Sequence, residues 1–200
     1  MMRKKAILSS WLWLAAALVL SACGSGYSLR GGVIEPPKFA PDFTLTDQNG
    51  RAFRLSDQRG KIVLIFFGYS ACPNVCPVSV AQMAAARREL LQEANDVQGV
   101  FVTIDPERDS QSRLQRYMSV FDPTFLGLRG SDDELQSVMK AYGVTAVRKE
   151  EPNSALGYSI DHSAFIYVID RTGRLREIMP YGLQVDDLVN DVRFYVHEKG

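Results

Sequence analysis

The stretch KIVLIFFGYSACPNVCPVSVAQMAAARREL, residues 61–90, decides the fold of this chain. Its first nine residues are a continuous apolar run, which is typical of a β-strand buried on both faces of a sheet. Cys72 and Cys76 follow, each directly before a proline, and Pro77 suits the first turn of a helix that continues to about residue 94. We therefore expect the cysteine pair at the junction between a buried strand and the next helix.

The segments on either side alternate between strand and helix patterns. Residues 42–57 form two alternating runs around an Asn-Gly turn, a strong hairpin signal. The further segments are a buried strand (97–105), a helix (110–121), a short strand (124–130), a helix with a capping box (131–143), a hairpin (162–182) and a last helix (184–200). This order predicts an α/β domain with a thioredoxin-like fold: a central mixed β-sheet flanked by helices, with an N-terminal β-hairpin extension.

The N-terminus has the pattern of a secretory signal peptide over residues 1–22. MMRKK supplies positive charge, and the apolar run of residues 6–22 is short of the roughly 20 residues that span a bilayer, so an uncleaved membrane anchor is the weaker interpretation. LSAC, residues 20–23, resembles the lipobox of bacterial lipoproteins. The resemblance implies that Cys23 carries a diacylglyceryl group and holds the protein at a membrane of the bacterial cell envelope, on the extracytoplasmic side.

Residues 23–40 are rich in Gly, Ser and Pro, which predicts a lipidated N-terminus and a flexible tether before one domain over residues 41–200. Removing residues 1–22 takes away three basic and no acidic residues and leaves a net charge of −3. A mildly acidic domain has no electrostatic footprint for nucleic acid. In an envelope compartment disulfides persist, so Cys72 and Cys76 are open to oxidation.

The two cysteines are suited either to redox chemistry or to a metal. A helix N-terminus favours thiolate, the form that attacks disulfides and binds metals. Thioredoxin-type reductases use C-x-x-C, whereas three residues separate Cys72 from Cys76. A closed zinc site needs four ligands, while two thiolates and one imidazole suit monovalent copper.

Only His162 and His197 could supply the imidazole. His197 belongs to the last turn of the terminal helix, where a cation suits the helix dipole, and we interpret it as a surface residue. His162 precedes a strongly apolar strand, at the place where thioredoxins carry a cis-proline beside their redox cysteines. This position favours His162 as a ligand.

Three motifs together, GYSACPNVCP (68–77), VTIDPERD (102–109) and DHSAFIYVID (161–170), resemble the Sco/SenC family of envelope copper chaperones. The resemblance runs from about Pro41 to the C-terminal helix. It implies that Cys72, Cys76 and His162 bind copper, as Cu(I) or Cu(II), and that the protein assists assembly of the dinuclear copper centre of cytochrome c oxidase. Its partners would then be the oxidase copper-site subunit and other copper chaperones.

The chain departs from the family pattern near the cysteines. Many members have Thr-His before the first cysteine and an aspartate inside the loop, where this chain has Ser70, Ala71 and Asn74. Neither change removes a ligand, but a docking role of the acidic loop residue does not transfer to Asn74. Asp105 ends a strand near the same sheet edge, where it either tunes the site or serves as an ordinary helix cap or ion-pair partner.

Three other functions compete with copper carriage. The first is a thiol-disulfide oxidoreductase in which Cys72 and Cys76 are the redox-active pair and reduce cysteines of the oxidase subunit. The second is a peroxidase of the peroxiredoxin type, but those enzymes carry a proline and a hydroxyl residue ahead of the reactive cysteine. The third is a binding module stapled by a disulfide, and so small a loop gains little from a cross-link. His162 separates the oxidoreductase from the copper carrier, since a reductase tolerates the loss of His162 and a copper carrier does not.

The lipobox pattern predicts that Cys23→Ser abolishes lipidation, because the variant lacks the thiol that receives the diacylglyceryl group. Metabolic labelling with a fatty acid should mark the parent and the Cys72→Ser control, but not Cys23→Ser. Full labelling of Cys23→Ser would contradict the anchor.

Overall fold

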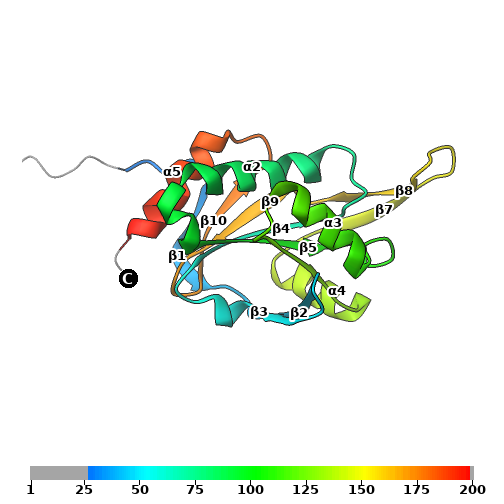
Figure 1. Cartoon of the computed structure of the whole chain (residues 1–200), viewed down its shortest axis with the longest axis horizontal. Coiled ribbons are helices and arrows are strands. Elements are labelled where there is room, and N and C mark those ends of the chain that lie inside the picture. The colour runs from blue at the N-terminus through cyan, green and yellow to red at the C-terminus, as the bar shows by residue number, and fades with distance from the viewer. Residues whose placement is uncertain (1–26, 199–200) are drawn as a thin grey trace, which may run out of the picture.

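The computed structural model describes residues 27–198 (Figure 1). Eight strands form one sheet in the order β1-β10-β9-β4-β5-β6-β2-β3, and two more form the separate pair β7-β8. The strands are β1 (Gly32–Phe39), β2 (Thr44–Asp47), β3 (Ala52–Arg54), β4 (Ile62–Gly68), β5 (Val97–Thr103), β6 (Leu126–Arg129), β7 (Ala146–Glu151), β8 (Gly157–His162), β9 (Phe165–Ile169) and β10 (Arg174–Pro180). The α-helices are α2 (Val75–Glu89), α3 (Gln111–Phe121), α4 (Asp132–Ala141) and α5 (Val185–His197), and the 3-10 helices are η1 (Leu55–Gln58) and η2 (Leu91–Asp96).

Strand β4 lies at the centre of the sheet, as its apolar sequence predicts. All of its residues are buried. It pairs in parallel with β5 and antiparallel with β9, so that Phe66 faces Phe101 on one side and Ile166 on the other. Helices α2, α3 and α5 cover one face of the sheet and α4 lies on the other (Figure 1). The predicted mixed sheet flanked by helices is confirmed, and so is the N-terminal hairpin, which pairs β2 with β3.

The helix ends follow the sequence signals, with one correction. Ser131 and Glu134 form the predicted capping box at the start of α4. Helix α2, however, begins at Val75 rather than at Pro77, so Cys76 lies inside its first turn. The amides of the first turn have no partner within a helix, so a proline at the third position costs no hydrogen bond and does not mark the start.

The predicted tether over residues 23–40 is too long. Gly32–Phe39 forms strand β1, which pairs antiparallel with β10 at the edge of the sheet. Its two prolines lie in the unpaired stretch between Val33 and Lys38, where the register shifts. Proline has no N–H for a ladder but is tolerated at a sheet edge, so the composition concealed a strand. Cys23 and the predicted signal peptide lie outside the described residues.

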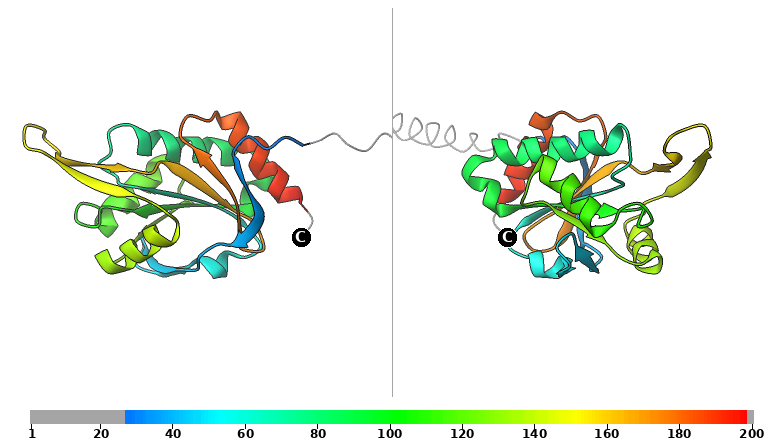
Figure 2. Two further views of the ribbon diagram at one scale, coloured as in Figure 1. Left: turned by 180° about the vertical axis from the view of Figure 1, so that it is seen from behind. Right: turned by 45° about the vertical axis from the view of Figure 1, so that its right-hand side comes forward.

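The β7-β8 hairpin has no counterpart in the predicted elements. Five of the six β7 residues are exposed and the strand is highly charged, so it shows no apolar alternation. Figure 2 shows this hairpin projecting from the body of the molecule. Within residues 27–198, no helix combines the length and the apolar character that a membrane span requires.

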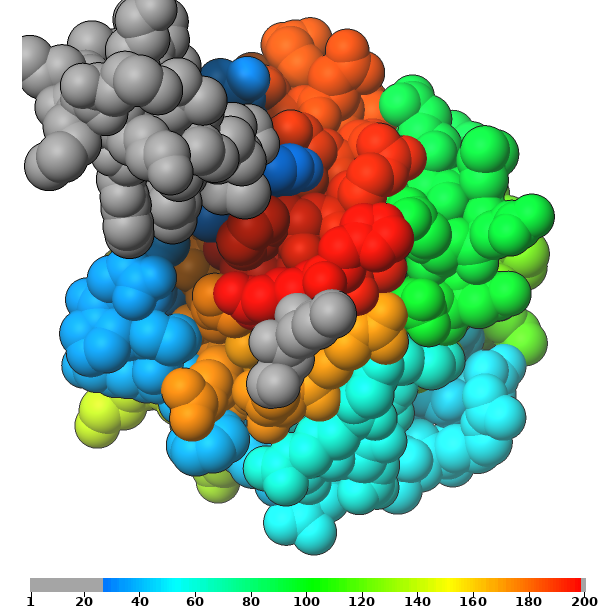
Figure 3. All heavy atoms as spheres, turned by 90° about the vertical axis from the view of Figure 1, so that its left-hand side faces the viewer, coloured from blue at the N-terminus to red at the C-terminus, as the bar shows by residue number. Residues whose placement is uncertain are grey.

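A buried acidic pair, Glu177 on β10 and Asp191 on α5, fastens the chain that precedes β1. Both residues are 0% exposed. The Gly31 amide donates to Glu177 Oε1 (3.1 Å) and to Asp191 Oδ2 (3.0 Å), and the Arg30 amide donates to Asp191 Oδ2 (2.7 Å). A Cβ on Gly31 would lie 2.8 Å from the Glu177 carboxyl carbon, so a larger residue there would displace the Glu177 side chain. The first described residues therefore lie against α5 (Figure 3).

Burial, and next the hydrogen bond and negative charge of Asp191, raise the pKa of Glu177 from 4.5 to about 8. The neutral form is thus favoured in the folded protein, and its contribution to stability is present below pH 4.5 and is lost as the pH rises through 8. We predict that Glu177→Gln removes this loss, so that the variant gains stability relative to the parent between these pH values. Urea unfolding across the pH range measures it, with exposed Glu89→Gln as the control. A parent and a Glu177→Gln variant with parallel profiles would contradict the prediction.

Candidate metal centre

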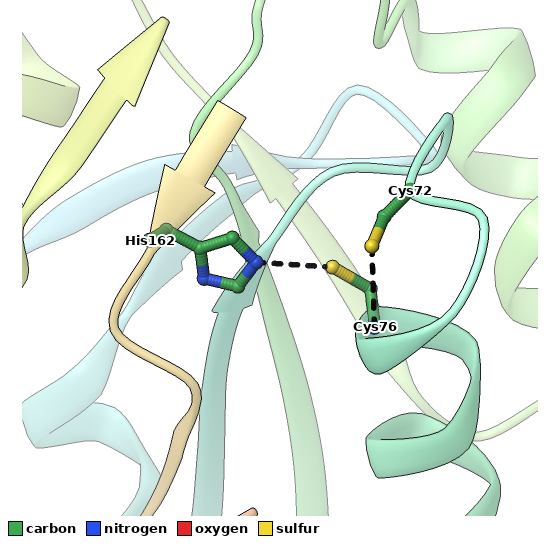
Figure 4. A group of neighbouring side chains, drawn as sticks. All are labelled: Cys72, Cys76 and His162. Atoms are coloured by element: carbon green, nitrogen blue, oxygen red, sulfur yellow. Dashed lines mark hydrogen bonds between the residues drawn. The ribbon is translucent and has the colours of Figure 1, made fainter. Parts of the chain in front are cut away.

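Three side chains from distant parts of the chain converge at one end of the sheet (Figure 4). Cys72 lies in the loop after β4, Cys76 in the first turn of α2, and His162 at the end of β8. Their ligand atoms all lie within 4.8 Å of one another. Cys76 is fully buried, whereas Cys72 and His162 are partly exposed. All three residues predicted as metal ligands therefore belong to one cluster.

The cysteine loop is held to the end of β5 by a buried carboxylate. Asp109 is 0% exposed and accepts hydrogen bonds from the Ser70 amide (3.0 Å), the Ser70 hydroxyl and the Thr103 hydroxyl (2.7 Å). The loop also turns on itself, since the Cys72 amide donates to the Tyr69 carbonyl at 3.2 Å. These contacts fix the direction from which Cys72 reaches the cluster.

The hydrogen bonds of His162 determine its tautomer. Nδ1 lies 2.9 Å from the carbonyl oxygen of Ser163, and because a carbonyl only accepts, Nδ1 carries the proton. In the neutral imidazole, Nε2 then has a free lone pair, and it lies 3.3 Å from Cys76 Sγ. The nitrogen directed at the sulfur atoms is thus the one that can bind a metal or accept a proton.

The two thiols have opposite acidities. The Cys76 thiol as hydrogen-bond donor, and then the amides at the start of α2, lower the pKa of Cys72 well below its usual range. One of these amides, that of Cys76, lies 3.5 Å from Cys72 Sγ. The same hydrogen bond, together with burial, raises the pKa of the Cys76 thiol. The thiolate therefore resides on the accessible Cys72, although the sequence placed Cys76 nearest to the helix start.

Gly68, the last residue of β4, is a part of the site that the sequence analysis did not single out. A Cβ at this position would lie 2.9 Å from Cys76 Sγ and 2.8 Å from the ring of Phe66. Glycine lets the strand end pass directly beside the buried sulfur. The available signal was a glycine ending an otherwise bulky buried strand, which often marks such a close approach.

The other candidate residues lie outside the ligand cluster. His197 is exposed on α5, with its Nε2 2.6 Å from Glu93 Oε1, in agreement with the surface role expected of it. Asn74 is the residue before α2 and makes no capping hydrogen bond with its side chain. Asp105 is buried and forms an ion pair with Arg108 (2.5 Å). Of the roles considered for Asp105 from the sequence, its contacts therefore match that of an ion-pair partner.

The donor set determines what the cluster can do. Two sulfurs and one imidazole nitrogen are soft and borderline ligands that suit copper, and among the described residues there is no fourth side chain to close a zinc site. The same sulfurs are near enough to exchange with a disulfide.

Comparison with known proteins identifies the family. A family model described as SCO1/SenC matches residues 32–197, most of the chain. The chain belongs to the SCO1/SenC family. It is similar to a SCO2-like protein of Rickettsia felis, with 36% identity over 137 residues that cover 68% of this chain and 67% of the relative.

Solved structures of SCO1/SenC proteins share the fold. One is Bradyrhizobium japonicum ScoI with copper bound, 35% identical, with a TM-score of 0.72 over 79% of this chain and 99% of that one. Another is yeast Sco1 with copper bound, 31% identical, with a TM-score of 0.71 over 82% of this chain and 91% of that one. The predicted fold class and the family resemblance are both confirmed.

The acidities predict which cysteine reacts. In the reduced, metal-free protein, iodoacetamide should label Cys72 at a rate that changes little between pH 8 and 6, because its thiolate persists far below the ordinary cysteine pKa of about 8.5. Cys76→Ala should shift this profile upward in pH, because it removes the main hydrogen-bond donor to the Cys72 sulfur. In Cys72→Ser, the buried Cys76 should stay almost unlabelled. Mass spectrometry follows both sites, and two ordinary titrations near pH 8.5 would contradict the assignment.

Proposed function

We propose that this SCO1/SenC protein is a copper metallochaperone that binds copper through Cys72, Cys76 and His162 and assists assembly of the dinuclear copper centre of cytochrome c oxidase. The observation that carries the proposal is the convergence of these three ligand atoms within 4.8 Å. Copper in the solved Bradyrhizobium japonicum and yeast relatives supports it. The oxidase role rests on the family resemblance.

Copper is the cargo of this site, and the chain supplies a ligand set that can release it. Two thiolates favour Cu(I), and the Nε2 lone pair of His162 adds a ligand that Cu(II) prefers. Cys76 is fully buried, while Cys72 and His162 are reachable from solvent. A partner subunit can therefore approach the metal from the Cys72 and His162 side and exchange its own ligands for theirs.

Thiol-disulfide exchange is a second candidate function, favoured by the unequal acidities of the two thiols. The Cys72 thiolate would attack a partner disulfide and release one partner thiolate. Cys76, after losing its proton, would then attack the mixed disulfide, so that the partner gains two electrons and Cys72–Cys76 becomes the disulfide. His162 Nε2, 3.3 Å from Cys76 Sγ, is placed to take that proton.

The proposed setting is the bacterial cell envelope, with the protein anchored through Cys23. Three residues separate Cys23 from Tyr27, and Tyr27 lies against Phe194 of α5 with ring centroids 4.8 Å apart. Such a connection spans at most about 14 Å, so the lipid would hold the α5 end near the membrane. The cysteine loop and the β7-β8 hairpin lie at the other end of the molecule (Figure 1), where they face possible partners: the oxidase subunit and other copper chaperones.

The copper proposal predicts a specific loss in His162→Ala. Affinity for Cu(I), measured by anaerobic titration against a competing chelator, should fall more than about 100-fold, since even residues behind a ligand commonly cost 10–100-fold. The loss for Cu(II) should be larger, because that ion depends more on imidazole nitrogen. His197→Ala, which removes the other histidine, should bind both ions like the parent.

The same variant separates the two functions. In His162→Ala both cysteines remain, so the Cys72–Cys76 disulfide should still form while oxidase assembly in cells fails. Parental affinity for both copper ions together with full oxidase activity would refute copper carriage and favour the oxidoreductase.

A further inference from the structure

The strand that carries His162 has little support of its own. Within the described residues, β8 pairs with β7 alone, outside the eight-stranded sheet. An isolated two-stranded hairpin is at best marginally stable in water. Figures 1 and 2 show this hairpin extending beyond the body of the protein, so side-chain contacts along β8 must help to hold the strand in place.

A stack of alternating aromatic and guanidinium groups lies beside the first residues of β8, near the hairpin turn, where Tyr158 pairs with Glu150 of β7. The Arg108 guanidinium lies over the Tyr158 ring of β8 (3.6 Å to the centroid) and 5.4 Å from the Tyr69 ring, which follows β4. Arg148 covers the other face of Tyr158 at 3.5 Å. Arg108 thus lies between Tyr69, which precedes the cysteine loop, and Tyr158 of β8, the strand that carries His162. Arg148 lies on the outer side of this stack.

Arg108 also bonds directly to the start of β8. Its NH1 donates to the carbonyl oxygens of Leu156 (3.1 Å) and Tyr158 (2.9 Å). Its Nε donates to Asp105 Oδ2 (2.5 Å), and Asp105 Oδ1 accepts the Tyr158 hydroxyl (2.8 Å). With side chains 16% and 3% exposed, Arg108 and Asp105 form a largely desolvated pair tied to one strand.

Tyr69 makes the second attachment, closer to the ligand. Its hydroxyl accepts the Ile160 amide of β8 at 3.2 Å, two residues before His162. Its ring meets the imidazole edge-on, with centroids 6.0 Å apart. The strand is therefore held at residues 156–158 by Arg108 and at Ile160 by the residue stacked beside Arg108.

The neighbour of Arg108 holds the other half of the site. Asp109 accepts the Ser70 amide and hydroxyl, and so anchors the loop that carries Cys72. One short turn after β5, residues 105–109, thus contacts β8 through the side chain of Arg108 and the cysteine loop through the side chain of Asp109. Because the turn is a single covalent unit, it fixes the separation between the two segments.

We propose that Arg108 is a positioning residue for the metal centre: it holds β8 against the 105–109 turn and thereby sets the place of His162 Nε2 relative to Cys76 Sγ. The inference rests on the proposed copper binding. A ligand on a loosely held hairpin must be ordered when the metal binds, and that ordering lowers affinity, whereas a ligand held in place beforehand avoids the cost.

Arg108→Lys tests the proposal without leaving Asp105 as a buried charge alone. Lysine keeps the cation but loses the flat stack and the paired bonds to the two carbonyls. Exchange of the Ile160 amide in the metal-free protein should become faster, and Cu(I) affinity should fall about tenfold, the lower end for groups behind a ligand. Arg148→Lys is the matched control, since Arg148 stacks on the same ring but its side chain is 47% exposed; it should retain parental exchange and affinity.

A double-variant cycle shows whether Arg108 acts through His162. In the His162→Ala background, Arg108→Lys should cause no further loss of Cu(I) affinity. An equal loss in both backgrounds, or unchanged Ile160 exchange and affinity in Arg108→Lys, would overturn the proposal. Unfolding midpoints separate these results from general destabilisation. A parent that binds no copper would refute the proposed function, whereas Ile160 exchange would still decide whether Arg108 holds β8.

Discussion

The parallel pairing of β4 with β5 is the constraint on which the metal centre depends. Its register places Gly68 beside Thr103, and the Ile104 amide still donates to the Gly68 carbonyl, so the two strands end side by side. The cysteine loop and the 105–109 turn therefore start at the same edge of the sheet. Strand β9 is antiparallel to β4, so the chain that enters β9, with His162 shortly before it, reaches that edge too. The ligands meet because the parallel strands β4 and β5 end at this edge, while the antiparallel strand β9 begins at it.

The sequence predicted the strands and helices whose signals come from burial or from local caps and turns. An uninterrupted apolar run identifies β4, a largely apolar segment identifies β5, and a capping box identifies α4, because these signals depend on the segment alone. Strand β1 and the β7-β8 hairpin escaped prediction for a different reason. The partner of β1 is β10, some 140 residues away, and its prolines fall where the register shifts. The charged β7-β8 hairpin buries little apolar surface, so its sequence shows no periodic pattern of apolar residues from which a strand could be predicted.

The identity of the three ligands was within reach of the sequence, but their chemical states were not. Spacing and the histidine count point to Cys72, Cys76 and His162, whereas which sulfur is the thiolate depends on unequal burial and on the direction of one hydrogen bond. The fixed tautomer of His162 likewise depends on the Ser163 carbonyl, a backbone group that no motif records. Supporting groups such as Arg108 and Asp109 belong to a recognisable motif, yet their roles follow from contacts that span 39 residues or more.

The Cys76 thiol is the ligand whose protonation bears most on copper binding, because its pKa is raised by Cys72 and by burial. The Cys76 thiol lies 3.3 Å from His162 Nε2, and it also serves as the donor that stabilises the Cys72 thiolate. The three ligand atoms lie within 4.8 Å of one another. Copper binding in the proposed function would release the Cys76 proton, because thiolate and neutral imidazole are the forms that bind. The raised pKa of Cys76 thus makes copper compete with a proton for this sulfur.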